Sequence, residues 1–346
     1  MSTADRGRRV TITDVARHAG VSTSAVSKVL RNAYGVSDGM RERVRAAMAD
    51  LDYRPHAAAR GMRGRTYTIG VLLDNIRNAF FADILDGVGG ELRGSDYQML
   101  IGAAGFDSDD QTRLARALVD RQMDGLILIG PGFPRSEVLR TAASVPTVVI
   151  GHHDTADVHD SVVDADAVGA GLVVDHLVDL GHRRIALTSA RGNEGAGWPG
   201  TPERVQRRGY EEAMERHGLT EYARVATTAY SEEGGYRAGR ELLSTAPLPT
   251  AVFAGADVAA MGVFRAAREL GLRIPEDVSL AGYNNTAVAA LAPVRLTSVD
   301  QAGELMGATA ARLLLERLAG RTRSVLMSVS PTLVVRGTTG AAPGVA

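Results

Sequence analysis

The sequence of 346 residues contains no cysteine and no long uninterrupted apolar segment. Without cysteine the chain cannot form a disulfide, a thiolate metal site or a thiol nucleophile, which suits a reducing compartment. No apolar run approaches the roughly eighteen residues that a membrane-spanning helix needs. The charged stretch MSTADRGRRV at the start of the sequence is not followed by the apolar run of a signal peptide. We therefore expect a soluble, cytoplasmic protein.

Lysine is almost as scarce, because Lys28 is the only one in the chain. The charges are unevenly distributed: thirteen basic and six acidic residues lie in the segment that ends at Arg65, against 26 and 34 in the remainder. A basic segment joined to an acidic body is typical of a protein that binds a polyanion with one end. A solvated basic tail would give the same distribution of charge.

Three short helices are predicted in the first fifty or so residues. Thr11 and Asp14 form a capping pair before the first helix, and Ser22 and Ser37 are candidate N-caps of the next two. The first two helices are joined by a tight turn that contains Gly20, as in a helix-turn-helix unit. A small three-helix bundle without a ligand is the alternative interpretation.

The second predicted helix, VSTSAVSKVL, has two different sides. Its apolar side consists of Val21, Val26, Val29 and Leu30. Its polar side consists of Thr23, Ser24, Ser27 and Lys28. Most of these polar residues are poor helix formers, and longer charged side chains would serve solubility better. This side is therefore expected to contact a partner.

The segment YRPHAAARGMRGRT (residues 53–66) separates the three helices from the rest of the chain. Pro55 and the three alanines favour a helix, whereas Gly61 and Gly64 confine it to a length that is unstable alone in water. The segment is either a plain linker or a helix that forms when a partner supports it.

From Tyr67 onward, short apolar runs alternate with amphipathic stretches, a pattern that predicts parallel strands with helical crossovers. The strands are too many for one domain, so we expect two α/β halves separated near residues 151–161. The predicted halves are 67–160 plus a returning segment near 285–320, and 161–284 plus 321–340. Open α/β sheets bind ligands beyond the carboxyl ends of their strands, so a cleft between the halves is the expected site.

The chain resembles the lactose-repressor (LacI/GalR) family of bacterial transcriptional regulators over nearly its whole length. The resemblance is carried, in the expected order, by VTITDVARHAGVSTSAVSKVL, VRAAMADLDYRPHAAARGM, IGVLLDNIRNAFFADILDGV, DGLILIGP, DHLVDLGHRRIAL, DVSLAGYNN and LTSVDQ. It implies an α-helical helix-turn-helix headpiece over residues 1–53 and a hinge helix over 54–66. Residues 67–340 would form an α/β core of two periplasmic-binding-protein-like (Rossmann-like) subdomains that dimerises and binds a small molecule.

The resemblance also implies roles in DNA binding. VSTSAVSKVL becomes the recognition helix in the major groove, where Thr23, Ser24 and Lys28 match positions that read base edges. Contacts to phosphate or sugar are expected from Thr11, Ser27, Arg31 and Ser37, and Ser22 is a further expected DNA contact. Met62 stands where the family usually has a leucine that wedges into the minor groove. His56 and Ala59 are the other expected contacts of the hinge.

The effector site implied by the resemblance consists of Asn78, Phe80, Phe81, Gln206, Tyr230, Asp257, Asn284 and Gln301. Three charged or polar anchors of the family are altered. Gln206 replaces the common arginine, Ala256 precedes Asp257 where the family has asparagine, and Asn284 replaces an aspartate. Neutral amides give up the stronger charge-assisted hydrogen bonds. We expect a small polar effector, such as an atypical or modified sugar, unless no inducer acts.

Three other patterns do not support a site. GAGWPG (195–200) matches a dinucleotide-binding loop literally, but Trp198 and Pro199 interrupt it and no helix follows until about Pro202. The His- and Asp-rich stretch 152–160 matches no standard set of metal ligands, and GHRR (181–184) is better interpreted as a turn. We predict neither a cofactor nor a metal ion.

The sequence thus predicts a homodimeric repressor that binds a pseudo-palindromic DNA operator and responds to a small-molecule effector. The alternative is a sugar-binding or sensory module whose headpiece is vestigial. An enzyme built on the α/β core would need a catalytic constellation, and we found none in the sequence. The operator sequence, and whether the effector induces or co-represses, stay open.

Overall fold

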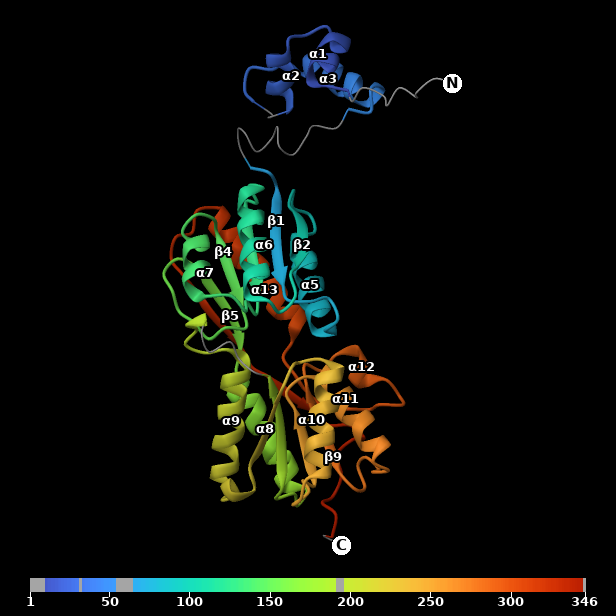
Figure 1. Cartoon of the computed structure of the whole chain (residues 1–346). Helices are drawn as coiled ribbons and strands as arrows, with labels where there is room; N and C mark the ends of the chain where they lie inside the picture. Colours follow the sequence, from blue (N-terminus) through green and yellow to red (C-terminus); the bar gives the residue numbers. More distant parts are fainter. Residues whose placement is uncertain (1–9, 31–32, 54–64, 191–195, 345–346) are drawn as a thin grey trace. The chain divides into compact units, whose positions relative to one another are not determined.

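A computed structural model describes residues 10–30, 33–53, 65–190 and 196–344 of the chain. The chain divides into two units, Met1–Thr66 and Tyr67–Ala346. The predicted hinge segment lies almost entirely outside the described residues, which resume at Arg65. Each of the two units has its own fold (Figure 1).

The first unit contains three helices, α1 (Ile12–Ala19), α2 (Thr23–Leu30) and α3 (Asp38–Asp50). The start of α1 is a capping box, in which the Thr11 hydroxyl and the Asp14 carboxylate each accept from the other residue's backbone N–H. Gly20 ends α1 in the left-handed conformation, with a φ of 65°. Val15, Val26 and Val44, one from each helix, are fully buried together. The predicted helices are confirmed, and so are their apolar faces except at Leu30.

The second unit contains two six-stranded sheets. The first sheet has the spatial order β11 (Leu326–Val329), β5 (Asp160–Asp164), β4 (Thr147–Ile150), β3 (Gly125–Ile129), β1 (Thr68–Leu73) and β2 (Gln98–Ala103). The second has the order β12 (Thr332–Val334), β10 (Thr297–Asp300), β9 (Ser279–Tyr283), β8 (Ala251–Ala254), β6 (Ile185–Ala190) and β7 (Arg224–Thr228). All neighbouring strands are parallel except β10 and β12.

Helices cover both faces of each sheet, which explains why the central strands are continuous apolar runs. The helices of the first sheet are α5 (Ala79–Leu92), α6 (Ser108–Asp120), α7 (Arg135–Ala142) and α13 (Gly303–Leu318). Those of the second are α8 (Asp166–Asp179), α9 (Pro202–Arg216), α10 (Glu232–Ser244), α11 (Asp257–Glu269) and α12 (Ala287–Ala290), with a short 3₁₀ turn at Thr220–Tyr222.

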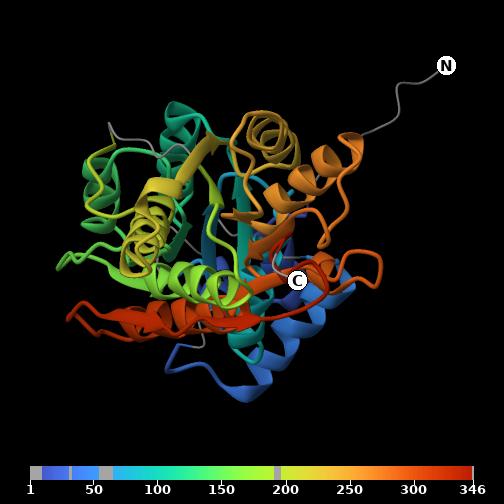
Figure 2. The same cartoon turned by 90° about the horizontal axis from the view of Figure 1, so that it is seen from below.

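Neighbouring strand residues show how the helices are divided between the faces of the second sheet. Ile185 and Leu187 pack with α8 and α9, whereas Ala186 between them packs with α10 and α11. Side chains alternate across a strand, so the two pairs of helices lie on opposite faces (Figure 2). The carboxyl ends of the parallel strands are thereby left uncovered.

The contact between α5 and α13 depends on glycine. A Cβ on Gly307 would lie 1.9 Å from the Ile84 carbonyl oxygen, and one on Gly87 would lie 2.0 Å from the Glu304 carbonyl oxygen. The backbones of the two helices are therefore closer than any larger residue permits at these positions. This contact fixes α13 to the first sheet, although α13 follows β10 of the second sheet in the chain.

The chain crosses between the two halves of the core three times, after β5, after β10 and between β11 and β12. The predicted assignment of segments to halves was wrong in two places. The returning segment 285–320 splits, because β10 joins the second sheet before α13 packs on the first. The segment 321–340 also splits, because β11 pairs with β5 of the first sheet. Apolar periodicity identifies a strand but does not say which sheet it joins.

None of the helices in the described part of the chain combines the length and the apolar character that crossing a membrane requires.

Candidate DNA-reading helix and ligand cleft

Helix α2 presents its polar side to solvent. Thr23, Ser24 and Lys28 are exposed, while Val26 and Val29 on the other side are buried against α1 and α3. Leu30 departs from the prediction, because 37% of its surface is exposed and it does not belong to the buried cluster. The helix is therefore held by its two central valines, with Val21 partly buried beside them.

Three of the predicted DNA contacts, Thr11, Ser22 and Ser37, stand at the starts of the three helices. The Ser22 hydroxyl accepts from the Ala25 backbone N–H at 3.1 Å, so Ser22 caps α2 as predicted. Ser37 occupies the N-cap position of α3 without a side-chain capping bond. All three residues are exposed, and helix N-termini with exposed N–H groups suit phosphate oxygens. Ser27 is half-buried on α2.

Four of the predicted DNA contacts lie outside the described residues: Arg31, His56, Ala59 and Met62. Their roles in binding phosphate or the minor groove stay predictions.

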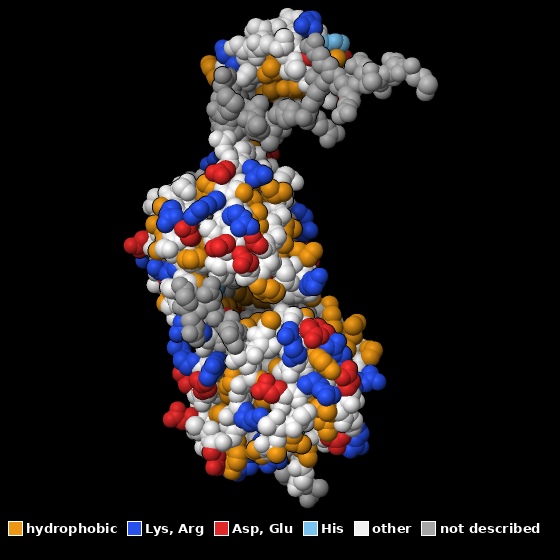
Figure 3. All heavy atoms as spheres, in the orientation of Figure 1, with side chains coloured by type: hydrophobic (Ala, Val, Ile, Leu, Met, Phe, Trp, Pro, Cys, Tyr) orange, Lys and Arg blue, Asp and Glu red, His pale blue; other side chains and the backbone are white. Residues whose placement is uncertain are grey.

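The core contains a cleft of about 950 Å³, and Figure 3 shows the surface hollowed between the two halves. Residues that follow β1, β2, β3 and β4 line it from one half, and residues that follow β6, β7, β8, β9 and β10 line it from the other. The carboxyl ends of both parallel sheets therefore meet at the cleft, as the rule for open α/β sheets requires. Seven of the eight predicted effector residues line it: Asn78, Phe80, Phe81, Gln206, Tyr230, Asn284 and Gln301.

Three amide side chains that line the cleft take part in hydrogen bonds. The Tyr230 hydroxyl donates to Gln206 Oε1 at 2.9 Å, and Gln206 Nε2 donates to the Gly255 carbonyl at 3.2 Å. Asn284 Nδ2 donates to Gln301 Oε1 at 2.5 Å. Asn284 has a φ of 113°, a strained conformation that such hydrogen bonds hold in place. Gln206 thus orients Tyr230, and these three amide groups are held in position without a ligand.

Comparisons with known proteins agree with both parts of this architecture. Residues 11–56 match the model of bacterial regulatory proteins of the lacI family, and residues 174–339 match a periplasmic binding protein-like domain. The HTH-type transcriptional repressor PurR of Erwinia tasmaniensis is 33% identical over 334 residues, which cover 94% of this chain and 96% of that protein. The chain belongs to the LacI family.

Solved structures of LacI-family regulators have the same fold along the chain. The lac repressor dimer bound to operator and the anti-inducer ONPF gives a TM-score of 0.79 at 27% identity, covering 96% of this chain and all of that one. The regulator CelR in complex with cellobiose gives a TM-score of 0.70 at 30% identity, covering 95% of this chain and all of that one. The predicted fold class, a helical headpiece with a periplasmic-binding-protein-like core, is confirmed.

Asp257 is the one predicted effector residue that the structure places elsewhere. Its side chain is 1% exposed and does not line the cleft. Its carboxylate accepts from the Thr286 backbone N–H at 2.7 Å, the Thr286 hydroxyl at 3.0 Å and the Ser298 hydroxyl at 2.6 Å. Burial raises the pKa of Asp257 to about 6. As the first residue of α11 it points back into the sheet, so in this LacI-family member it holds the β9 and β10 ends together.

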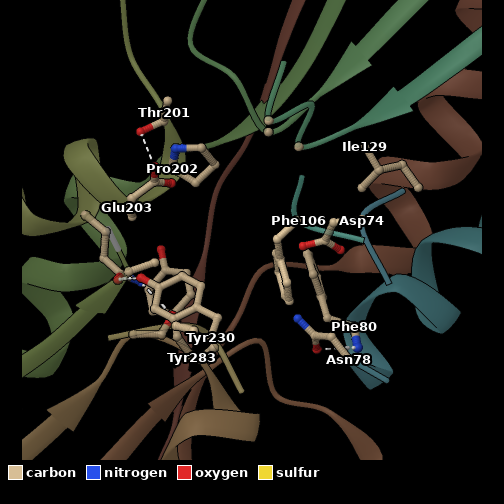
Figure 4. Close-up of a pocket in the computed structure, with 18 of the residues that line it drawn as sticks. Asp74, Asn78, Phe80, Phe106, Ile129, Thr201, Pro202, Glu203, Tyr230 and Tyr283 are labelled. Atoms are coloured by element: carbon tan, nitrogen blue, oxygen red, sulfur yellow. Dashed lines mark hydrogen bonds between the residues drawn. The ribbon is translucent and has the colours of Figure 1, made fainter. Parts of the chain in front are cut away.

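Six carboxyl groups that the sequence analysis missed line the cleft: the exposed Asp107 and Glu241, and the buried or half-buried Asp74, Asp164, Asp166 and Glu203. Asp74 directly follows β1 and Asp164 ends β5, so a search for acidic residues at the ends of buried strands would have found them. Figure 4 shows Asp74 and Glu203 on opposite sides of the cavity. Burial raises the pKa of Asp74 to about 6 and also raises the pKa of Glu203.

Asp164 and Asp166 form a hydrogen-bonded group at the crossing after β5. The Tyr283 hydroxyl donates to Asp164 Oδ2 at 2.9 Å, and His153 Nε2 lies 2.7 Å from Asp166 Oδ2. Burial, followed by the neighbouring charge of Asp164, raises the pKa of Asp166. Burial also lowers the pKa of His153, so both shifts favour a neutral imidazole beside a protonated carboxyl group.

Two of the three patterns that the sequence analysis set aside contribute residues to the cleft, and the third has a structural role. Trp198 lines it and donates from Nε1 to the Phe133 carbonyl at 3.0 Å, and His152 meets the Trp198 ring edge-on with centroids 4.1 Å apart. Helix α9 begins at Pro202, after the loop. His182 contacts the Thr250 and Ser279 hydroxyl groups at 3.0 Å, which is a structural role.

Proposed function

We propose that this LacI-family protein is a transcriptional repressor whose affinity for operator DNA is controlled by a small polar effector, sugar-like in its hydroxyl groups, bound in the cleft of the core. The observation that carries the proposal is the presence of both parts in one chain. A helix-turn-helix unit exposes Thr23, Ser24 and Lys28, and a cleft of about 950 Å³ holds amide groups in fixed positions.

DNA binding by α2 follows from the chemistry of its exposed side. Short hydroxyl groups can donate to or accept from several bases at close approach, and Lys28 can donate to guanine O6 or N7. A dimer would place two such helices on the two half-sites of a pseudo-palindromic operator. The lac repressor in the structure named above is a dimer bound to operator, which supports the same arrangement for this chain. The operator is genomic DNA, so we place the protein in the cytoplasm.

Effector control follows from the position of the cleft. Its walls come from both halves of the core, so a ligand that contacts both walls favours one angle between the halves over another. CelR, whose structure contains cellobiose, supports a sugar-like ligand for this cleft. The whole-length relative PurR is named a repressor, which supports a binding role for the cleft rather than a catalytic one.

The test is selection of binding sites from fragmented genomic DNA by the full-length protein, followed by titration of the best site at several salt concentrations. We expect one pseudo-palindromic motif and a log–log slope of binding against salt that corresponds to several phosphate contacts. As a control, Lys28→Ala should weaken the preference for one base in each half-site but keep most of the salt slope. Recovery of no motif, together with a flat salt dependence, would contradict the proposal and favour a sensory module with a vestigial headpiece.

A further inference from the structure

Acidic side chains outnumber basic ones among the described residues that line the cleft, and Arg204, which does not line it, places a positive charge near Glu203. Asp164 and Asp166 are buried, and Asp74 and Glu203 are half-buried. The one basic side chain among the described lining residues is Arg237, which is 73% exposed and lies 3.7 Å from Glu233. Residues 191–195 lie outside the described residues. An anionic ligand would therefore meet carboxyl groups on both walls.

The side chains beside the carboxyl groups also favour positive charge. Six of the sixteen aromatic residues of the chain line the cleft: Phe80, Phe81, Phe106, Trp198, Tyr230 and Tyr283. The face of an aromatic ring is the negative end of its quadrupole, so it attracts cations and also packs against the C–H groups of a sugar ring. In Figure 4, Asp74 lies beside Phe80 and Phe106 on one wall, so a carboxylate and aromatic rings are presented together.

Two buried polar atoms in the cleft have no partner among the described residues. One is Asn284 Oδ1, on a side chain that is 9% exposed and whose Nδ2 is already bonded to Gln301. The other is His152 Nδ1, on a side chain that is 4% exposed. Burial lowers the pKa of His152 to about 3, so its ring is neutral. An unpaired amide oxygen requires a donor, and a hydroxyl or amino group of a ligand supplies one.

From these three observations we propose that the effector is a hydroxylated amine, such as an amino sugar, whose ammonium group is bound by Asp74, Glu203 or both. The hydroxyl groups of such a molecule would meet Asn284 and the other polar atoms, and its ring carbons would pack on the aromatic faces. A charge-assisted hydrogen bond from an ammonium group is about twice as strong as one from a neutral hydroxyl. The proposal rests on the proposed function, because it takes the cleft to be the effector site.

The experiment is calorimetry of the full-length protein with sets of three matched probes. Each set contains an amino sugar, the neutral sugar with a hydroxyl in its place and the N-acetylated derivative, for the gluco, galacto and manno configurations. Glucose 6-phosphate and glucuronate serve as anionic probes. We expect at least one free amine to bind about tenfold more tightly than both of its neutral counterparts, which corresponds to one added charged contact.

Variants then locate the ammonium group. Asp74→Asn and Glu203→Gln keep the shape and remove the charge, so one or both should abolish the preference for the amine. The control is Glu215→Gln, which removes an exposed carboxylate near the end of α9 that does not line the cleft and should leave the preference unchanged. Thermal unfolding of each variant shows whether the fold is kept.

Four results would overturn the inference: no probe binds, a neutral sugar binds as tightly as its amine, an anionic probe binds best, or neither Asp74→Asn nor Glu203→Gln alters the preference. DNA titration of the same protein separates this failure from failure of the proposed function. A protein that binds its operator with a steep salt slope but prefers a neutral or anionic ligand contradicts the amine alone. A protein that does not bind DNA contradicts the repressor itself.

Discussion

Replacing Asp257 by asparagine tests whether its buried carboxylate is a structural group that costs stability when ionised. Asparagine has the same shape, and its oxygen can still accept from the two Thr286 donors at the present Oδ2 position. Its amide nitrogen would face the Ser298 hydroxyl, which can rotate to accept. The substitution therefore removes the charge while keeping the hydrogen-bonded connection.

The size of the effect follows from the pKa of about 6 that burial gives Asp257, against 3.8 in the unfolded chain. A raised pKa means that the folded state binds the proton more tightly, so the contribution of this group to stability falls as the pH rises. At 1.36 kcal/mol per pKa unit, the ionised group disfavours folding by about 3 kcal/mol at pH 7.5 and by about half of that at pH 5. The Asp257→Asn protein should therefore gain about 1 to 1.5 kcal/mol over the wild type between pH 5 and pH 7.5.

The assay is urea unfolding of wild type and variant at pH 5.0, 6.0 and 7.5, because the difference between the two proteins cancels the titration of other groups. A difference that is constant with pH would refute the assigned pKa. A difference that moves against the variant at high pH would show that the three donors stabilise the ionised form more than burial destabilises it. Ligand affinity provides a second check: because Asp257 lies outside the cleft, the variant should bind the effector as wild type does.

Three further predictions concern the headpiece and the packing of the core. In the full-length protein, Lys28→Ala should cost about 1 to 3 kcal/mol at one base position per half-site, measured by binding-site selection; an equal loss on all sequences would make Lys28 a phosphate contact. Thr11→Ala removes the capping box of α1 and should speed hydrogen exchange of its first amides about fivefold, whereas unchanged exchange would show that the box contributes nothing. Gly307→Ala should lower the free energy of unfolding by about 1 to 3 kcal/mol, because the new Cβ would collide with the Ile84 carbonyl oxygen. The control Gly89→Ala, on the open side of α5, should be neutral or stabilising, and equal losses in both would contradict the packing argument.

The sequence predicts the elements of this fold well because apolar periodicity is a local signal. The helices of the headpiece and the strands of both sheets follow from it, and the rule for parallel sheets then predicts a cleft at their carboxyl ends. The path of the chain between the sheets is not local. Neither the pairing of β11 with β5 nor the return of α13 could be found in the sequence, because both depend on contacts with segments distant in the chain.

The residues of the candidate cleft also divide into those that sequence patterns can predict and those that depend on contacts between distant segments. Asn78 and Tyr230 were assigned to it through the family resemblance, and both lie in loops that follow strands, where side chains face the cleft. Asp257 occupies a similar place in the sequence, but the direction of its side chain depends on Thr286 and Ser298, far along the chain. The acidic character of the walls could be found only in part, since Asp166 and Glu203 lie within the first turns of helices.

The three crossings between the halves of the core lie side by side, because Val329 is paired with Asp164 and Thr332 is paired with Asp300. The angle between the two halves can therefore change only if all three connecting segments bend together. Asp164, Asp166 and Gln301 lie at these connecting segments and also line the cleft. A ligand that shifts these side chains acts next to the connecting segments. A small change of angle there moves each residue of a half in proportion to its distance from these segments. The cleft therefore lies next to the connections about which the two halves would turn, and the far ends of the halves would move the most.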